Sequence, residues 1–270
     1  MSMTDSSNRS DGSGHQAVFD SSSAIEQLLG STLVLVAHPD DESVGCGMLL
    51  QGIKAAGILL CTDGGPAIAR PWYMRVLHSR TRYSGKRLAE FRSASHIAGV
   101  RYTCEMKGIQ DQLLYQSLER AAGFLADYIV QYRPHAILSH AFEAGHPDHD
   151  CCAFLAHWAG RKFSLPVWEM PLYYRPAPSS PLVYQQFLCC YGNEIELFPE
   201  PDKLLRKTRM LSEHRSQAAV ISKFDRTREV FRPQPAYDFS VNPNPVLSSF
   251  AVCDHITIGC VLERFRSFAQ

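Results

Sequence analysis

Imidazole and carboxylate side chains are concentrated in two short segments of the sequence, which together supply three histidines and five carboxylates: His38-Pro39-Asp40-Asp41-Glu42 and His146-Pro147-Asp148-His149-Asp150. Uncompensated, so much acid in one crevice would repel itself, and a divalent cation is its natural neutraliser. Imidazole and carboxylate ligands favour zinc, which in catalytic sites keeps three protein ligands and one position open for water. Because the metal lowers the pKa of that water to about 7, a carboxylate beside it can take the proton. The two segments therefore predict a hydrolytic metal site.

The same pattern has a plainer interpretation and leaves the ligands open. One His-Pro-Asp tripeptide alone is more often a turn than a site. Two such segments, both acidic and both placed after short apolar runs, favour the site. His38, Asp41 and His149 would form a site of two histidines and one carboxylate. Spacing alone does not choose Asp40 over Asp41, or Asp150 over His149.

Strands must bring the two segments together. Short apolar runs over 33–37, 58–61 and 136–139 are typical of buried parallel strands, and helices are expected over 43–56, 82–98 and 117–132. The alternation predicts an α/β fold with a doubly wound, mostly parallel sheet and helices on both faces. In such sheets ligands bind beyond the carboxyl ends of the strands. Residues 38–42 and the expected loop 146–149 follow the first and third runs, so they should meet at one edge.

The rest of the chain is less regular from about residue 165 onward. We expect strands over 100–106, 167–174 and 182–191, a long helix over 202–224 that carries His214, a proline-rich loop over 232–245 and an amphipathic segment over 256–268 that docks on the domain. Residues 1–22 are rich in Ser, Gly and Asp and are predicted to be disordered. Residues 23–270 are predicted to form a single domain.

Bulk composition narrows the class of protein. Lys+Arg and Asp+Glu both number 27, so no net charge favours nucleic acid as a partner. The nine cysteines show no CxxC spacing and are interpreted as reduced thiols. No apolar run approaches the roughly 18 residues of a membrane span, and the N-terminal region lacks an apolar signal core. A cytoplasmic protein without a membrane span is expected, and a homo-oligomer is compatible with the sequence.

The motifs resemble those of the PIG-L/LmbE-like deacetylases, a family of zinc-dependent enzymes that act on N-acetylglucosaminyl compounds. The matching pieces follow one another from about residue 31 to 220: Ala37 to Glu42 with Gly45-Cys46-Gly47, Thr62-Asp63-Gly64, Arg87-Leu88-Ala89-Glu90, Ala98-Gly99-Val100, Asp111, Gly145 to His149, and His214-Arg215-Ser216-Gln217. The resemblance implies a Rossmann-like fold and hydrolysis of an amide, not a peptide, bond in a small N-acetylated glycoside or glycoconjugate.

The resemblance also implies roles for individual residues. His38, Asp41 and His149 would bind Zn²⁺, with Fe²⁺ as the alternative metal, and Asp40 would be the general base. His146 would act as general acid or stabilise the oxyanion, oriented by Asp148. Arg87 and Asp111 are implied to contact the substrate sugar.

The sequence departs from the mycothiol-type member of that family at two positions. Ala144 stands where that enzyme has a Tyr two residues before the second-motif histidine, so another donor would have to polarise the amide carbonyl, and the tyrosines in 73–83 and 173–191 are candidates. Gly65 stands where that enzyme has an acidic residue after the second strand. Both changes bear on the particular substrate and leave the metal site intact.

A basic aromatic stretch over residues 70–87 has two interpretations. Its arginines and Lys86 alternate with Trp72, Tyr73 and Tyr83. It is either a solvated loop or a lid that stacks on sugar or aromatic groups and pairs with an anionic group.

Three other functions compete with deacetylation of an amino sugar. The metal site alone also permits cleavage of another acyl or thiol conjugate. A metal-dependent phosphoesterase would use similar ligands but usually two metals about 4 Å apart. A nucleotide-binding Rossmann module would need a GxGxxG loop after the first strand, where His38-Pro39 stands instead.

Overall fold

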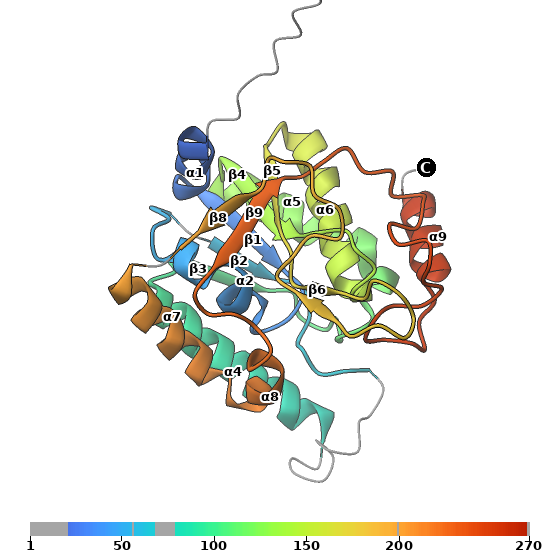
Figure 1. Ribbon diagram of the computed structural model, residues 1–270, viewed down its shortest axis with the longest axis horizontal. Coiled ribbons are helices and arrows are strands. Elements are labelled where there is room, and N and C mark those ends of the chain that lie inside the picture. Colours follow the sequence, from blue (N-terminus) through green and yellow to red (C-terminus); the bar gives the residue numbers. More distant parts are fainter. Residues whose placement is uncertain (1–20, 56, 68–78, 199, 269–270) are drawn as a thin grey trace, which may run out of the picture.

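A seven-stranded sheet forms the centre of the computed structural model, which describes residues 21–55, 57–67, 79–198 and 200–268 (Figure 1). The strand order is β3-β2-β1-β4-β5-β9-β8. The first five strands pair in parallel: β1 (Thr32–Val36), β2 (Gly57–Leu60), β3 (Tyr102–Glu105), β4 (Ala136–His140) and β5 (Val167–Met170). β9 (Glu229–Pro233) pairs antiparallel with both β5 and β8 (Ile195–Leu197). The C-terminal part of the chain therefore completes the same sheet.

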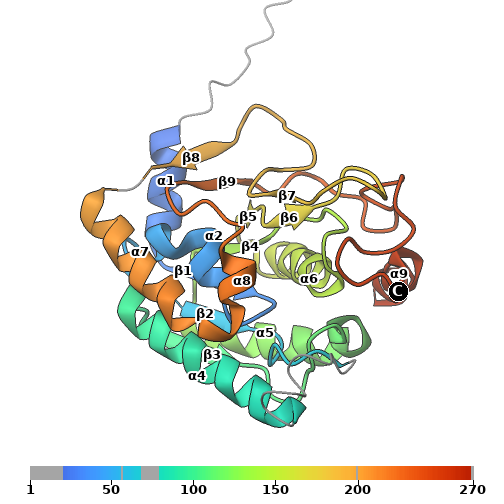
Figure 2. The ribbon, with the colours of Figure 1, turned by 60° about the horizontal axis from the view of Figure 1, so that its bottom comes forward.

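Helices cover both faces of the sheet (Figures 1 and 2). One face carries α1 (Ser21–Leu29), α2 (Asp41–Leu50), α4 (Arg80–Ala98) and α7 (Pro201–Glu213), and the other α5 (Leu118–Tyr132), α6 (Pro147–Phe163) and α9 (Ile258–Phe268). β1 shows why both faces are apolar, because Val34 and Val36 pack with the first group and Leu33 and Leu35 with the second. The predicted doubly wound, mostly parallel α/β fold is confirmed, and so is the docking of the amphipathic C-terminal segment.

Several predicted elements differ from the structure. Residues 147–149 are not loop but the first turn of α6. The helix expected over 202–224 ends at Glu213 and is followed by a 3₁₀ turn, η2 (Arg215–Gln217), and α8 (Ala218–Ile221). The strand expected over 182–191 shrinks to β7 (Val183–Tyr184), paired with β6 (Tyr173–Tyr174), and the loop expected over 232–245 begins inside β9. Tertiary pairing decides these short elements, so local sequence patterns do not reveal them.

The predicted domain boundaries can be compared with the structure only in part. Residues 1–20 lie outside the described residues, and Ser21 and Ser22, placed in the disordered segment by the sequence prediction, begin α1. The single-domain organisation of 23–270 stays a prediction. In the part of the chain that the structure describes, none of the helices combines the length and apolar character that crossing a bilayer requires.

Helix α2, which starts at the predicted metal ligand Asp41, is kinked and held by a buried ion pair. Cys46 has non-helical dihedral angles (φ −143°, ψ 25°) and kinks the helix, which then ends at Leu50 instead of running to residue 56. The freed N–H groups of Met48 and Leu49 donate to the carboxylate of Glu229 (2.7 and 3.0 Å). The ammonium of Lys207 donates to that carboxylate at 2.8 Å and to the carbonyl of Val44 at 3.1 Å. Glu229 and Lys207 thus replace the backbone bonds that the kink breaks.

Replacing Lys207 by Met should destabilise the fold by about 3–5 kcal/mol, because it leaves the fully buried Glu229 carboxylate without its counter-ion. The free energy of unfolding from urea titrations measures the effect. Lys207→Met with Glu229→Gln should recover part of the loss, since no buried charge then remains. Lys203→Met, one turn earlier on the same helix, where the ammonium is partly exposed and paired with Glu200, should change stability by less than about 0.5 kcal/mol. A double variant as unstable as the single one would contradict the buried-charge explanation.

Candidate metal centre

The two His-Pro-Asp segments meet at the carboxyl edge of the sheet because β1 and β4 are neighbours. His38 stands two residues after β1, and α2 begins three residues later at Asp41. His146 is the N-cap of α6, where its Nδ1 accepts the N–H of Asp148 (3.2 Å), and Pro147 fills the first helical position. The predicted meeting of the two segments at one edge is confirmed.

Three atoms form a compact group that we call the His-Asp triangle: His38 Nδ1, Asp41 Oδ2 and His149 Nε2. The distances between them are 3.3 Å from His38 to Asp41, 3.2 Å from His38 to His149 and 3.5 Å from His149 to Asp41. Tetrahedral zinc with bonds of about 2.0–2.1 Å spaces its ligand atoms about 3.3–3.4 Å apart. The triangle therefore fits a metal ion without rearrangement of the backbone.

A fourth histidine, His140, lies beside the triangle and was not singled out from the sequence. Its ring stacks on that of His149 (centroids 4.1 Å apart), and its Nε2 is 3.4 Å from Asp41 Oδ2. The backbone N–H of Ala37 donates to this nitrogen at 3.1 Å, and burial lowers the pKa of His140 to about 4. His140 Nε2 thus already accepts a hydrogen bond, although His140 also forms, with Asp41 and His149, a group of residues that could hold a metal ion. Its position at the end of β4, next to β1, is the signal that could have found it.

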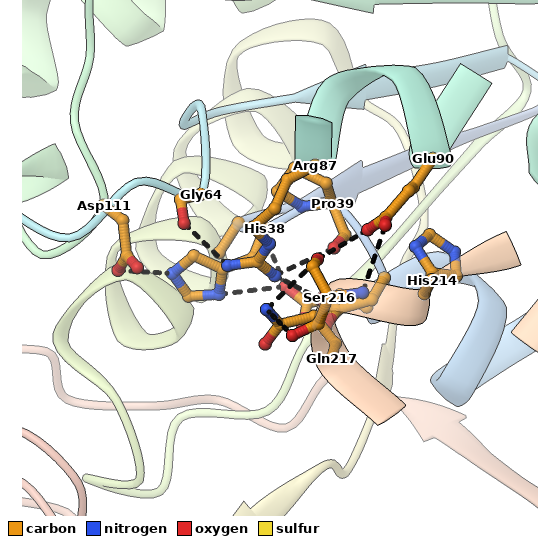
Figure 3. A network of polar contacts seen from close by, with 12 residues as sticks. His38, Pro39, Gly64, Arg87, Glu90, Asp111, His214, Ser216 and Gln217 are labelled. Atoms are coloured by element: carbon orange, nitrogen blue, oxygen red, sulfur yellow. Dashed lines mark hydrogen bonds and ion pairs between the residues drawn. The ribbon is translucent and has the colours of Figure 1, made fainter. Parts of the chain in front are cut away.

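The other side of the His38 ring faces two carboxylates. Its Nε2 lies 3.1 Å from Asp111 Oδ1 and 3.3 Å from Asp148 Oδ2 (Figure 3 shows the Asp111 contact). The backbone N–H groups of Gln112 and Leu114 fix the Asp148 carboxylate at 2.6 and 3.0 Å. A carboxylate behind a ligating imidazole fixes its tautomer and raises its basicity. Asp148 therefore contacts His146 through its backbone N–H, while its carboxylate acts on His38.

The electrostatics of the centre favour a bound cation. Burial alone would lower the pKa of His38, but Asp111 and Asp41 raise it well above its ordinary value. A position at which the surrounding carboxylates hold a proton so firmly also attracts a metal ion in its place. Asp111, predicted to contact the sugar, lies within this acidic group and also 3.5 Å from His146 Nε2.

Asp40 lies beside the triangle but points to Arg87. Its Oδ1 accepts a hydrogen bond from the Arg87 guanidinium at 2.9 Å. The same guanidinium donates to the carbonyls of Pro39 (2.9 Å) and Gly64 (2.7 Å), which are labelled in Figure 3. Burial raises the pKa of Asp40 to about 6, although Arg87 opposes the rise. Arg87, predicted to contact the substrate sugar, is thus placed to hold Asp40 and the surrounding backbone.

The backbone at Asp40 is strained. Its φ of 133° lies in a region that residues with a Cβ rarely adopt. Such strain costs about 1–3 kcal/mol and persists where the surrounding structure enforces it. Here the enforcing contacts are the Arg87 bonds and the 3.1 Å bond from the Asp40 N–H to Glu42. The Asp40 carboxylate is thereby held against the Arg87 guanidinium.

The late segment 214–217 closes one side of the centre (Figure 3). His214 Nε2 lies 3.0 Å from Ser43 Oγ and 3.4 Å from Glu42 Oε1, in direct contact with the first motif. Ser216 binds the carboxylate of Glu90 through its N–H (3.0 Å) and its hydroxyl (2.5 Å). His214 is therefore a buried supporting residue at the end of α7, not a residue inside a long helix.

A cavity of about 360 Å³ opens onto the centre. Its lining combines polar and apolar residues and includes His38, Asp40, Asp41, Arg87, Asp111, Gln112, His146, Tyr173, Tyr184, Val220 and Phe224. Of the predicted basic aromatic stretch, residues 70–78 lie outside the described residues. Arg80 is paired with Asp63 at 2.5 Å, and Ala144 is fully buried in the core, away from this lining.

Comparison with known proteins gives this geometry a context. Residues 33–159 match the family model described as PIG-L, GlcNAc-PI de-N-acetylase. The 1D-myo-inositol 2-acetamido-2-deoxy-alpha-D-glucopyranoside deacetylase of Mycobacterium avium (strain 104) is 31% identical over 140 residues, which cover 43% of this chain and 47% of that protein. The chain thus spans about half the length of this curated relative.

Solved structures share the fold over more of the chain. A deacetylase from the biosynthesis pathway of teicoplanin superposes with a TM-score of 0.59 at 17% identity, covering 75% of this chain and 96% of that one. The N,N'-diacetylchitobiose deacetylase of Pyrococcus horikoshii gives a TM-score of 0.52 at 17% identity, with 82% and 95% covered.

The doubly wound sheet and the cluster at its carboxyl edge define an α/β protein with a His/Asp metal site. Within that class, the matched segment 33–159 contains both His-Pro-Asp motifs and the triangle. Over residues 33–159 the chain is therefore similar to the PIG-L deacetylases, and its fold is similar to that of solved deacetylases over a larger part of the chain. The resemblance predicted from the sequence motifs is confirmed over the matched segment.

Proposed function

We propose that the protein is a metal-dependent hydrolase that removes the N-acetyl group from a small glycoside or glycoconjugate containing an N-acetylated amino sugar. The observation that carries the proposal is the His-Asp triangle with the non-ligating Asp40 beside it, at the floor of a cavity. His38, Asp41 and His149 would hold the metal, with Zn²⁺ as the first candidate and Fe²⁺ as the second. A divalent ion held there polarises an amide carbonyl and lowers the pKa of water.

The residues around the triangle divide the remaining chemistry. Asp40, with a pKa raised to about 6 and its carboxylate held by Arg87, would take the proton of the attacking water. The same carboxyl group, once protonated, would return the proton to the leaving amine. Free amine and acetate are then the products.

His146 is suited to bind the oxyanion rather than to supply a proton. Burial lowers its pKa well below the ordinary value, so the ring is neutral. Its Nδ1 accepts the N–H of Asp148, which leaves the proton on Nε2 at the cavity. A neutral N–H donor aimed at the carbonyl oxygen stabilises the charge that develops there.

Removal of the metal should abolish the reaction reversibly. We expect metal-loaded protein to release acetate from one or more members of a panel of N-acetylglucosaminides, including an inositol glycoside and N,N'-diacetylchitobiose. A chelator should stop the release, and one equivalent of Zn²⁺ per chain should restore it. Acetate and metal content are both measured. Turnover of 4-nitrophenyl phosphate with two metals per chain would instead support a phosphoesterase.

A further inference from the structure

Tyr173 brings an aromatic hydroxyl to the candidate metal centre from a third strand of the sheet. β1 and β4 deliver the two motifs, and Tyr173 stands three residues past the end of β5, the next neighbour of β4. Its ring contacts the ring of His149 with centroids 5.2 Å apart, and its side chain lines the cavity. Three adjacent strands therefore converge on one point.

The backbone around Tyr173 holds it against the second motif. β6 pairs with β7, with Tyr173 opposite Tyr184. The centroid of the Tyr173 ring lies 6.2 Å from that of Tyr184 and 6.4 Å from that of Phe224. A Cβ on Gly145 would stand 2.1 Å from the carbonyl oxygen of Tyr173. Position 145, next to His146, therefore has to be glycine for the two backbone segments, at residues 145 and 173, to approach so closely. The placement of Tyr173 relative to His146 is set by packing.

The Tyr173 hydroxyl is available to a ligand. Across residues 21–55, 57–67, 79–198 and 200–268, no hydrogen bond to this hydroxyl is present. A phenol is protonated at neutral pH, so this hydroxyl can donate a hydrogen bond to a molecule in the cavity that it lines.

An oxyanion formed at the triangle needs donors that are fixed before the reaction starts. His146 Nε2 provides one such donor. His146 and Tyr173 both contact the ring of His149, each with centroids 5.2 Å from it, and both line the same cavity. We propose that Tyr173 is a catalytic residue that donates its phenolic hydrogen bond to the carbonyl oxygen of the scissile amide. This assignment rests on the proposed deacetylase function and adds a residue to it.

Tyr173→Phe tests the assignment, since it removes only the hydroxyl. Loss of one oxyanion donor lowers kcat by about 10²–10³-fold, while KM should stay within about threefold. Metal content should be unchanged. Binding of a tetrahedral phosphonamidate analogue of the substrate should weaken by a factor similar to the loss in kcat, and binding of the product amine should not.

Tyr174→Phe is the matched control, because Tyr174 is the neighbouring residue of β6, pairs with Val183 and does not line the cavity. It should keep kcat within about threefold of wild type. An active wild type with an equally active Tyr173→Phe, or a Tyr173→Phe defect confined to KM, overturns the role of Tyr173 alone. Failure of wild type to release acetate in a chelator-sensitive manner overturns the proposed function itself, and the role of Tyr173 with it.

Discussion

Asp40→Asn should bind the metal normally and lose about 10²–10⁴-fold in kcat, the range that a positioned general base contributes. The triangle does not include Asp40, whose Oδ1 is bonded to Arg87 at 2.9 Å, so the ligand set survives the substitution. The amide of Asn can still occupy the site but cannot accept a proton from water. Steady-state kinetics with metal analysis on the same samples measures both quantities.

The control for this variant is Asp63→Asn. Asp63 is also an aspartate after a strand of the sheet, but it is paired with Arg80 and does not line the cavity. It should keep turnover near the wild-type value. Loss of metal from Asp40→Asn would show that Asp40 is a ligand and would refute its assignment as the base.

His149→Ala should have the opposite profile, with the metal lost and activity lost as a result. The substitution removes one vertex of the triangle. Loss of a residue that only supports a metal ligand lowers metal affinity by about 10–100-fold, and loss of His149 should lower it further. Competition with a coloured chelator gives the affinity. Excess metal should restore part of the activity only if the two remaining ligands still hold the ion.

His157→Ala is the matched control on the same helix, two turns further along α6, and should retain full metal content. His140→Ala distinguishes the two possible histidine sets. If His140→Ala loses the metal and His149→Ala keeps it, the ligand set is centred on His140 and the assignment made from the sequence is wrong.

The sequence predicts the part of the fold that depends on local pattern. The strand that ends at Val36 and the strand that begins at Ala136 are buried on both faces of the sheet. Such strands are recognised in a sequence by their continuous run of apolar residues. Helix α4 can also be predicted from local sequence. The Ser79 side chain caps its start by accepting the N–H of Arg82, and Gly99 ends it with a φ of 78°. The convergence of the two motifs then follows from the rule for parallel sheets.

The sequence does not predict features that depend on contacts between distant residues. Arg87 was expected to face the sugar, yet the carbonyls of Pro39 and Gly64 and the carboxylate of Asp40 all converge on its guanidinium. His140 had no motif around it and gains its place only from strand adjacency. The kink inside α2 is held by a glutamate about 180 residues away, so no local propensity could reveal it.

The buried ion pair between Lys207 and Glu229 limits how far the chain can be shortened. The segment that matches the family model stops at residue 159, before both residues of this ion pair and before β5. A fragment cut there would contain every vertex of the triangle and yet leave two amide hydrogens and one carbonyl of the kinked helix without partners. We therefore expect that the matched segment 33–159 does not fold on its own. A shortened version of the protein would have to retain these two distant side chains as well as the motifs.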